Sequence, residues 1–224
     1  MRINKYLADK KISTRRGADD LIKNKKVFIN GKLAELGSQV SEKDIVEVKG
    51  APIKEYKYFA YNKPIGLETE SVSRLNLDND NIFPLGRLDK ASHGLLILTN
   101  DGRITDSLLN PKYIHEKEYL VKTSNKLRSN FKIKMEAGVN IEGYRTKPCQ
   151  VKIINENTFR VILTEGKKHQ IRRMCANLFQ EIADLKRERI MNIKLGNLKP
   201  NAIREIKGEE LEIFLKSLNI AKKS

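Results

Sequence analysis

Residues 86–102 read GRLDKASHGLLILTNDG, and this stretch decides how the larger part of the chain is interpreted. A charged tetrapeptide, RLDK, precedes the apolar segment 95–98, and the four residues between them, ASHG, end in a glycine. Gly86 and Gly94 bracket the acid Asp89, so the backbone on either side can approach a ligand closely. A turn that caps backbone N–H groups is the more common role for such an aspartate. The apolar segment would instead anchor Asp89 rigidly, and burial would then require a nearby cation to keep its carboxylate ionised.

A second stretch, EGKKHQIRRMCANL at 165–178, offers that cation on a predicted helix. Arg172 and Arg173 point about 100° apart on a helix, so one can face a carboxylate while the other faces a nucleic-acid backbone. Two solvated arginines are the alternative. In HEKEYLV, Tyr119 shares a strand face with Val121. Core packing is the default for this tyrosine, and stacking on a base is the alternative.

The charge of the whole chain favours a polyanionic partner. Its 224 residues are 39% hydrophobic, which is enough for one large domain or for a medium domain with a small appendage. Lys and Arg outnumber Asp and Glu by 44 to 28, giving a net charge of +16 and a pI of about 9.7. Nucleic acid is the commonest partner for such an excess. The alternative is an ordinary protein from a lysine-rich proteome.

Other features argue against disulfides, metals and membranes. The two cysteines form no C-x-x-C pair, and the three histidines have no ligand-like spacing; these residues are Cys149, Cys175, His93, His115 and His169. We therefore expect a reducing compartment, no metal and, in the absence of a cofactor motif, no cofactor. The start of the chain has no apolar signal region, and no run approaches the ~18 apolar residues of a transmembrane helix. These features predict a cytoplasmic protein.

The first fifty residues read as a unit of two helices, a hairpin and a strand. Ile3, Tyr6 and Leu7 share one helical face, and Ser13 or Thr14 can cap the second helix. The unit holds 12 basic and 7 acidic residues, and its basic groups on or near the helices are Lys5, Lys10, Lys11, Arg15, Arg16, Lys23, Lys25 and Lys26. An ordinary solvated helix face is the alternative interpretation of these residues. Sparse acidic residues favour contact with RNA.

The remaining chain follows a linker at 51–57 and reads as one α+β domain over 58–224. Gly50 and Pro52 mark the linker. Five segments have the pattern of strands: YKYFAYNKP, EKEYLVKTS, TKPCQVKII, TFRVILTEG and ERIMNIKLGNL. Three have the pattern of helices: ITDSLLNP, KKHQIRRMCANLF and KGEELEIFLKSLNIAKK. Strands predominate without strict β–α alternation. We therefore expect a small helical unit followed by a domain with a mainly antiparallel mixed sheet.

Two resemblances cover almost all of the chain. The stretches RINKYLADKKISTRRGADDLI and VFINGKLAELGSQVSEKDIVEV resemble the S4 RNA-binding domain. The stretches FPLGRLDKASHGLLILTNDG, HEKEYLV, EGKKHQIRRMC and LKRERIMNIKLGNL resemble the bacterial ribosomal-RNA pseudouridine synthases of the RsuA type, and most of all the branch that modifies 23S RNA. The combination of G-R-L-D with Q-I-R is more distinctive than either motif alone. A shorter stretch over 66–83 than is usual leaves the exact uridine open.

The resemblance implies a role for each matching residue. Asp89 takes the place of the catalytic aspartate, Arg172 that of its basic partner, Tyr119 that of the aromatic contacting the base, and Arg87 that of an RNA-holding arginine. The expected RNA contacts are Lys5, Arg15, Arg16, Lys25, Lys26, Arg87 and Arg173. The resemblance implies an enzyme that acts on ribosomal RNA without a cofactor. We expect it to be a monomer. A 16S-specific synthase and a non-catalytic ribosome-assembly factor are the alternatives.

Overall fold

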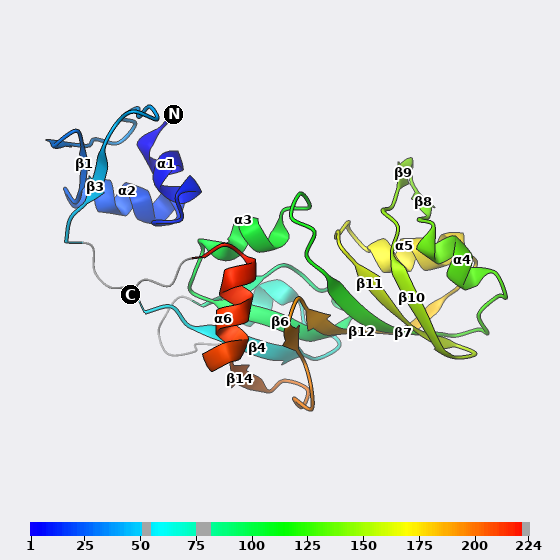
Figure 1. Cartoon of the computed structure of the whole chain (residues 1–224). Coiled ribbons are helices and arrows are strands. Elements are labelled where there is room, and N and C mark those ends of the chain that lie inside the picture. The colour runs from blue at the N-terminus through cyan, green and yellow to red at the C-terminus, as the bar shows by residue number, and fades with distance from the viewer. Residues whose placement is uncertain (51–54, 75–81, 221–224) are drawn as a thin grey trace. The chain divides into compact units, whose positions relative to one another are not determined.

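The computed structural model describes residues 1–50, 55–74 and 82–220, and these form two compact units (Figure 1). The N-terminal unit comprises Met1–Tyr56 together with Asp101–Ser107, and the larger unit comprises Lys57–Asn100 together with Leu108–Ser224. Residues 51–54 of the expected linker lie outside the described residues. Each unit has its own buried apolar cluster, as independent folding units do.

The N-terminal unit packs two helices against a small antiparallel sheet of order β2-β1-β3. The side chain of Thr14 accepts a hydrogen bond from the Gly17 N–H at 3.0 Å, which confirms Thr14 as a helix cap. A turn with positive φ at Asn30 and Gly31 joins the first two strands. The elements are α1 (Ile3–Asp9), α2 (Arg15–Lys23), β1 (Val27–Ile29), β2 (Lys32–Leu33) and β3 (Val46–Val48).

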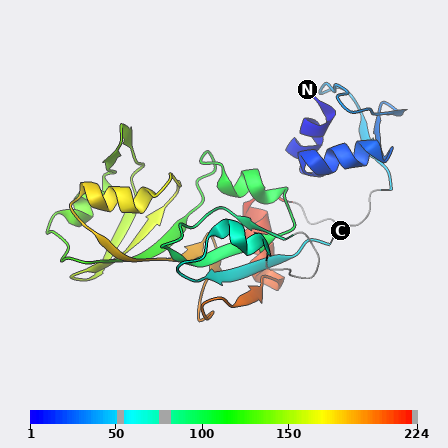
Figure 2. The same ribbon diagram turned by 180° about the vertical axis from the view of Figure 1, so that it is seen from behind.

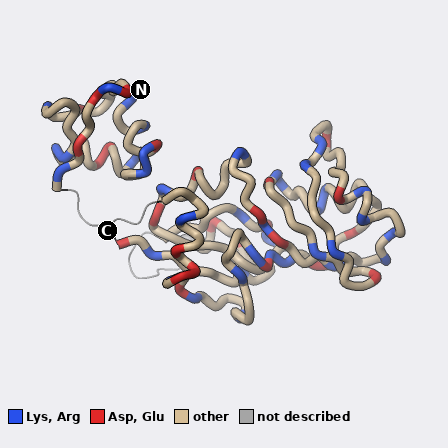
Figure 3. Tube along the Cα trace, in the orientation of Figure 1, with Lys and Arg blue, Asp and Glu red and all other residues tan. Residues whose placement is uncertain are grey.

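Buried apolar residues of the two helices and the sheet meet in one cluster that includes Ile3, Leu7, Ala18, Ile22 and Val27. The basic side chains therefore remain outside, and Figure 3 shows Lys and Arg at several points along this unit. Of the basic residues expected to contact RNA here, Lys5, Arg15, Arg16 and Lys25 are exposed. Lys26 is half-buried, and its ammonium group donates to the Gly50 carbonyl.

A nine-stranded mixed sheet forms the larger unit, in the order β10-β11-β7-β12-β6-β4-β14, with β13 paired to β12 and β5 to β6. Only the β12–β6 pair is parallel among these pairings, so the expected mainly antiparallel α+β fold is confirmed. The strands are β4 (Tyr58–Lys63), β5 (Phe83–Leu85), β6 (His93–Thr99), β7 (Lys117–Thr123), β10 (Gln150–Asn155), β11 (Thr158–Leu163), β12 (Ile182–Ile190), β13 (Ile193–Lys194) and β14 (Ile203–Glu205).

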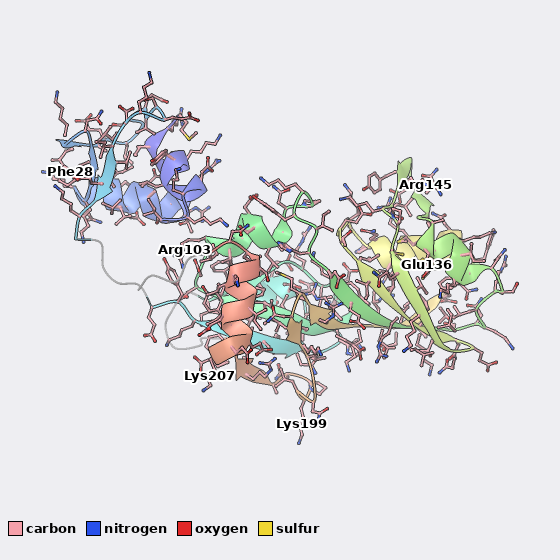
Figure 4. All side chains as sticks on the ribbon, in the orientation of Figure 1. Phe28, Arg103, Glu136, Arg145, Lys199 and Lys207 are labelled. Carbon is pink, nitrogen blue, oxygen red and sulfur yellow. The ribbon has the colours of Figure 1, made fainter. Side chains whose placement is uncertain are left out.

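Two helices, α4 and α5, lie on the same side of the β10–β11–β7 end of this sheet (Figures 1 and 2). The remaining elements are η1 (Thr69–Arg74), α3 (Ile104–Leu109), α4 (Phe131–Glu136), the hairpin β8 (Asn140–Ile141) and β9 (Tyr144–Arg145), α5 (Gln170–Asn177) and α6 (Gly208–Ser217). Phe131 and Phe159 meet edge to face at 4.8 Å. Glu136, labelled in Figure 4, accepts the Val151 N–H at 2.9 Å and so ties α4 to the edge strand.

Three elements differ from the sequence interpretation. Helix α5 begins at Gln170, not Lys167, because His169 adopts a left-handed conformation with φ of 50° that no α-helix accommodates. The segment 188–198 that we expected as one strand contains only the end of β12, which begins at Ile182, and the short strand β13. Helix α6 ends at Ser217, and residues 221–224 of the longer helix that we expected lie outside the described residues. No described helix combines the length and apolar character needed to cross a membrane.

Candidate active site

The loop that carries Asp89 is held on both sides by hydrogen bonds. The buried hydroxyl of Thr69 accepts the Leu88 N–H at 3.0 Å and donates to the Leu88 carbonyl at 2.8 Å. Just beyond, the Ser92 N–H donates to the Asp89 carbonyl at 2.9 Å. The loop then enters β6, whose apolar residues are fully buried. Asp89 therefore sits on a rigid turn between two fixed points.

A cavity of about 900 Å³ opens beside this loop in the larger unit. Its lining includes Asp89, Arg87 and Tyr119, three residues that the sequence singled out from two separate motifs. Tyr119 is half-buried on β7 and contacts the core cluster around Val121 as well as the cavity. The fold thus brings the carboxylate, an exposed arginine and an aromatic ring to one concave site.

Asp89 does not form the ion pair with Arg172 that we predicted. Its carboxylate, one third exposed, lies 3.2 Å from the Nε2 atom of His169. The reason is the late start of α5: His169 precedes the helix in a left-handed conformation and projects toward the loop. Arg172 instead donates from Nη2 to the Ala91 carbonyl at 3.0 Å and to the Ser92 hydroxyl at 3.2 Å. Arg172 therefore holds the loop two residues after Asp89.

Arg173 also differs from expectation, because its guanidinium contacts protein groups. It forms an ion pair with Glu142 at 2.5 Å, between Nη2 and Oε2, and Nη1 donates to the Lys168 carbonyl at 3.3 Å. The two arginines do point apart, as adjacent helical residues must. Arg172 turns to the Asp89 loop, whereas Arg173 turns to the β8–β9 hairpin. Arg145, labelled in Figure 4, lies in that hairpin.

Beneath the cavity, one row of paired residues crosses four strands. Tyr119 on β7 pairs with Arg187 on β12, Arg187 pairs with Gly94 on β6, and Gly94 pairs with Lys63 on β4. A Cβ atom at Gly94 would lie 2.3 Å from the Arg187 carbonyl oxygen, and the φ of Gly94 is +104°. Only glycine fits there. The row therefore places an aromatic ring and two cationic side chains on neighbouring strands.

Three cationic side chains lie in or under this cavity with little access to water. Lys63 is fully buried, and its ammonium group donates to the carbonyls of Pro64 and Leu67 at 3.0 and 2.7 Å. Burial lowers the pKa of Lys63, the Asp89 carboxylate opposes that change, and Arg187 adds to it. Burial, with the neighbouring charge of Arg187, lowers the pKa of Lys117 to about 8. Arg187 is 3% exposed.

Sequence reasoning missed four residues of this site: His169, Lys117, Lys63 and Arg187. A signal existed for two of them. Lys117 lies two residues before Tyr119 on one strand and so shares its face, and Arg187 lies two residues after the buried Leu185 and so shares that face. The contact of His169 with Asp89 depends on a left-handed residue that no periodicity reveals. Among the described residues, no group of three or more His, Cys, Asp or Glu side chains could hold a metal ion.

Comparisons with known proteins assign this architecture to a family. The RNA pseudouridylate synthase family model matches residues 57–177, and the S4 domain model matches residues 1–46. The dual-specificity RNA pseudouridine synthase RluF of Escherichia coli (strain K12) is 40% identical, over 94% of this chain and 77% of the relative. Ribosomal large subunit pseudouridine synthase B of Bacillus subtilis (strain 168) is 32% identical over 94% of each chain.

A solved structure agrees with these matches. The crystal structure of a pseudouridylate synthase superposes with a TM-score of 0.71 and 27% sequence identity, covering 97% of this chain and 99% of that one. The similarity thus extends over both units and includes the loop of Asp89, the strand of Tyr119 and the helix of Arg172. This chain belongs to the RNA pseudouridylate synthase family and carries an S4 domain at its N-terminus.

Proposed function

We propose that this RNA pseudouridine synthase isomerises uridine in ribosomal RNA, with 23S RNA as its substrate and Asp89 as the catalytic carboxylate. One observation carries the proposal: Asp89 sits on a rigid loop at the edge of the cavity that Tyr119 also lines. A carboxylate held in this way is pre-organised to act on a ribose that enters the cavity. The name of the Bacillus subtilis relative, ribosomal large subunit pseudouridine synthase B, supports the choice of 23S RNA.

The reaction needs one carboxylate. Isomerisation breaks the bond between N1 of uracil and C1′ of ribose, turns the base and reconnects it through C5. A glycosidase uses two carboxylates because water must replace the leaving group. Here the base returns to the same sugar, so Asp89 acts alone at the ribose, either as a nucleophile on C1′ or as a base. The reaction exchanges no electrons with a donor and transfers no group from a second substrate.

The other predicted site residues receive distinct roles in this proposal. Tyr119 contacts the target base in the cavity, and Arg87 holds the RNA at its exposed rim. Arg172 positions the catalytic loop through Ala91 and Ser92 and does not touch the carboxylate. Extruding the uridine from its stack costs a few kcal/mol, and phosphate contacts by the exposed basic groups offset this cost.

The N-terminal residues supply affinity in this scheme. We propose that 1–50 bind RNA through Lys5, Arg15, Arg16 and Lys25, that 51–57 link the units, and that 58–224 carry out the reaction. Lys26 contributes less because the Gly50 carbonyl holds it, and Arg173 contributes less because it pairs with Glu142. We further propose that the enzyme acts as a cytoplasmic monomer.

A second RNA target is the main alternative. The Escherichia coli relative is named a dual-specificity enzyme, and a 16S uridine would require the same site chemistry. Mapping pseudouridines in total RNA from cells with and without this gene distinguishes these cases. We expect at least one 23S position to lose its modification in the deletion strain. Loss at 16S or at another RNA instead would contradict the proposed substrate, and no loss anywhere would contradict the proposed function.

A further inference from the structure

Arg187 is buried under the cavity with one donor nitrogen unused. Its Nε atom donates to the Leu95 carbonyl at 2.7 Å, and Nη1 lies 3.5 Å from the Arg87 carbonyl. Its Nη2 atom is buried and has no hydrogen-bond partner. Leaving a donor of a charged group unsatisfied in the interior is costly. Because Arg187 lines the cavity, a substrate atom that enters it can satisfy Nη2.

Among the described residues, no carboxylate forms an ion pair with Arg187 or with its neighbour Lys117. Lys117 lines the same cavity, and no carboxylate opposes the lowering of its pKa. Glu165, a buried carboxylate of the lining, already accepts hydrogen bonds from Tyr144, Lys147 and Gln170. Asp89 lies beside His169. The cations Lys117 and Arg187 are therefore arranged around a space where a negative charge would be stabilised.

We propose that Arg187 is a catalytic residue that donates from Nη2 to a carbonyl oxygen of the target uracil and stabilises its negative charge, with Lys117 adding to the positive field. This rests on the proposed function. When the N1–C1′ bond breaks, both electrons remain on the base, so the uracil becomes an anion with charge on N1, O2 and O4. Donors that are fixed in place before such charge develops are most effective in a water-poor site.

The remaining steps of the isomerisation conserve every atom and electron. The sugar is held at C1′ by a bond to Asp89, or Asp89 takes the 2′ proton and leaves a C1′–C2′ double bond. The uracil anion then uses its electron pair to form C5–C1′, which releases the Asp89 carboxylate or lets Asp89 return its proton to C2′. The C5 proton passes to water, and N1 takes a proton from water. Arg187 keeps its charge throughout.

The position of Arg187 favours the base over a phosphate as its partner. Arg187 and Tyr119 are paired across β12 and β7, and directly paired residues have Cβ atoms about 5 Å apart on one face. A ring that contacts Tyr119 therefore lies within reach of the Arg187 guanidinium. Phosphates are better matched by the exposed cations at the rim, such as Arg87 and Lys168.

Single-turnover rates and RNA affinities test this proposal in the full-length enzyme, on a 23S fragment that contains the mapped uridine. At saturating RNA, Arg187→Ala should lower the rate on the order of 10²- to 10³-fold, with the dissociation constant changed less than about threefold. Added guanidinium ion should restore part of that rate. Lys117→Gln should lower the rate about tenfold. Lys186→Gln removes a cation from the same strand on the opposite face, outside the cavity lining, and should match wild type.

The outcomes separate the alternatives. A rate for Arg187→Ala within threefold of wild type overturns the proposal, and so does weaker RNA binding with an unchanged rate, which would assign Arg187 to a phosphate. Equal losses in Lys186→Gln would also overturn it. If Arg187→Ala fails to fold by its thermal unfolding curve, a folded Arg187→Lys at full rate overturns the proposal, and about a tenfold loss supports it. Full activity of Asp89→Asn would contradict the proposed function instead.

Discussion

The two units of this enzyme carry positive charge in opposite ways. In the N-terminal unit, Lys5, Arg15, Arg16 and Lys25 are exposed around an apolar core. In the larger unit, Lys63 and Arg187 are almost completely buried beneath a cavity. Exposed charges attract a polyanion over about 10 Å and are weakened by salt. Buried charges act on what enters the site and are screened much less.

Under the proposed function, this difference gives the two units different tasks. Exposed cations release counterions from RNA and so supply affinity that falls as salt rises. Buried cations are costly to maintain without a partner, so their presence indicates a site that receives a negative charge during its work. Changes at the cavity should therefore alter the rate of the reaction, and changes at the N-terminal surface should alter binding.

The largest effect should come from Asp89→Asn. The amide can neither attack C1′ nor take a proton from the ribose, so pseudouridine formation should fall by roughly 10⁴-fold or more. RNA affinity should stay the same or rise slightly, because one anion next to RNA is removed. Liquid chromatography of digested RNA measures the product. Substantial turnover by a folded Asn variant would remove Asp89 from the mechanism.

Gly94→Ala should unfold or distort the row of residues under the cavity. The new methyl group would lie 2.3 Å from the Arg187 carbonyl oxygen at a φ of +104°. Overpacking alone costs roughly 1–3 kcal/mol, and the left-handed backbone adds to it. Gly37→Ala is the matched control, because it shares a positive φ but has nothing within 4 Å. Denaturant unfolding measures the free energy of unfolding of both variants. Equal losses of stability would show that the contact of Gly94 with β12 is unimportant.

Arg172→Ala should lower the reaction rate about 10²-fold, and Arg173→Ala should lower it much less. Arg172 holds the Asp89 loop through Ala91 and Ser92, and misplacing that loop by 1 Å would cost about this factor if Asp89 acts as proposed. Arg173 pairs with Glu142 away from the loop. Because Arg172 does not touch the carboxylate, its loss should leave the pH profile of kcat unchanged. Equal losses in both variants would contradict a loop-holding role.

How far the sequence predicts the site depends on the range of each interaction. Asp89 and Tyr119 could be proposed from the sequence because local motifs mark them, and the strand pattern around Tyr119 gave its face correctly. The predicted partner of Asp89 was wrong, because it depends on a single left-handed residue, His169, at the start of α5. The row through Arg187 and Lys63 depends on register across four strands. Such long-range pairing has no local signature.

How well the sequence predicted the helices and strands also depended on the range of the interactions that stabilise them. Elements with clear caps or alternation, such as α2 with Thr14 and the strand of Tyr119, were predicted close to their observed bounds. The short helix α4 (Phe131–Glu136) was missed, because only Phe131 and Met135 are buried on it and it depends on packing against β10. Tertiary contacts, not intrinsic propensity, stabilise helices of this length.

A smaller effect should appear above pH 8. The pKa of Lys117 is lowered to about 8, so its ammonium group loses a proton as pH rises through this value. We therefore expect kcat/KM, which reports the free enzyme, to fall about tenfold with an apparent pKa near 8. Lys117→Arg should remove that decline. An unchanged alkaline limb in Lys117→Arg would exclude Lys117 as its cause.

One measurement tests the division of tasks most directly: single-turnover rate at saturating RNA and RNA affinity against salt, in four full-length enzymes. The first is wild type. The second replaces Lys5, Arg15, Arg16 and Lys25 with Gln, and the third is Asp89→Asn. A fourth enzyme, with Lys126, Lys199, Lys207 and Lys216 replaced by Gln, controls for exposed charge elsewhere; Lys199 and Lys207 are labelled in Figure 4.

We expect the N-terminal variant to bind more weakly, with the log–log salt slope flattened by roughly 0.7 to 0.9 for each lost phosphate contact, while its saturated rate stays within threefold of wild type. We expect the control to change the slope less. Asp89→Asn should keep the wild-type salt slope and lose the reaction. An N-terminal variant that binds like wild type, or that loses its saturated rate along with Asp89→Asn, would contradict the assignment of binding to one unit and chemistry to the other.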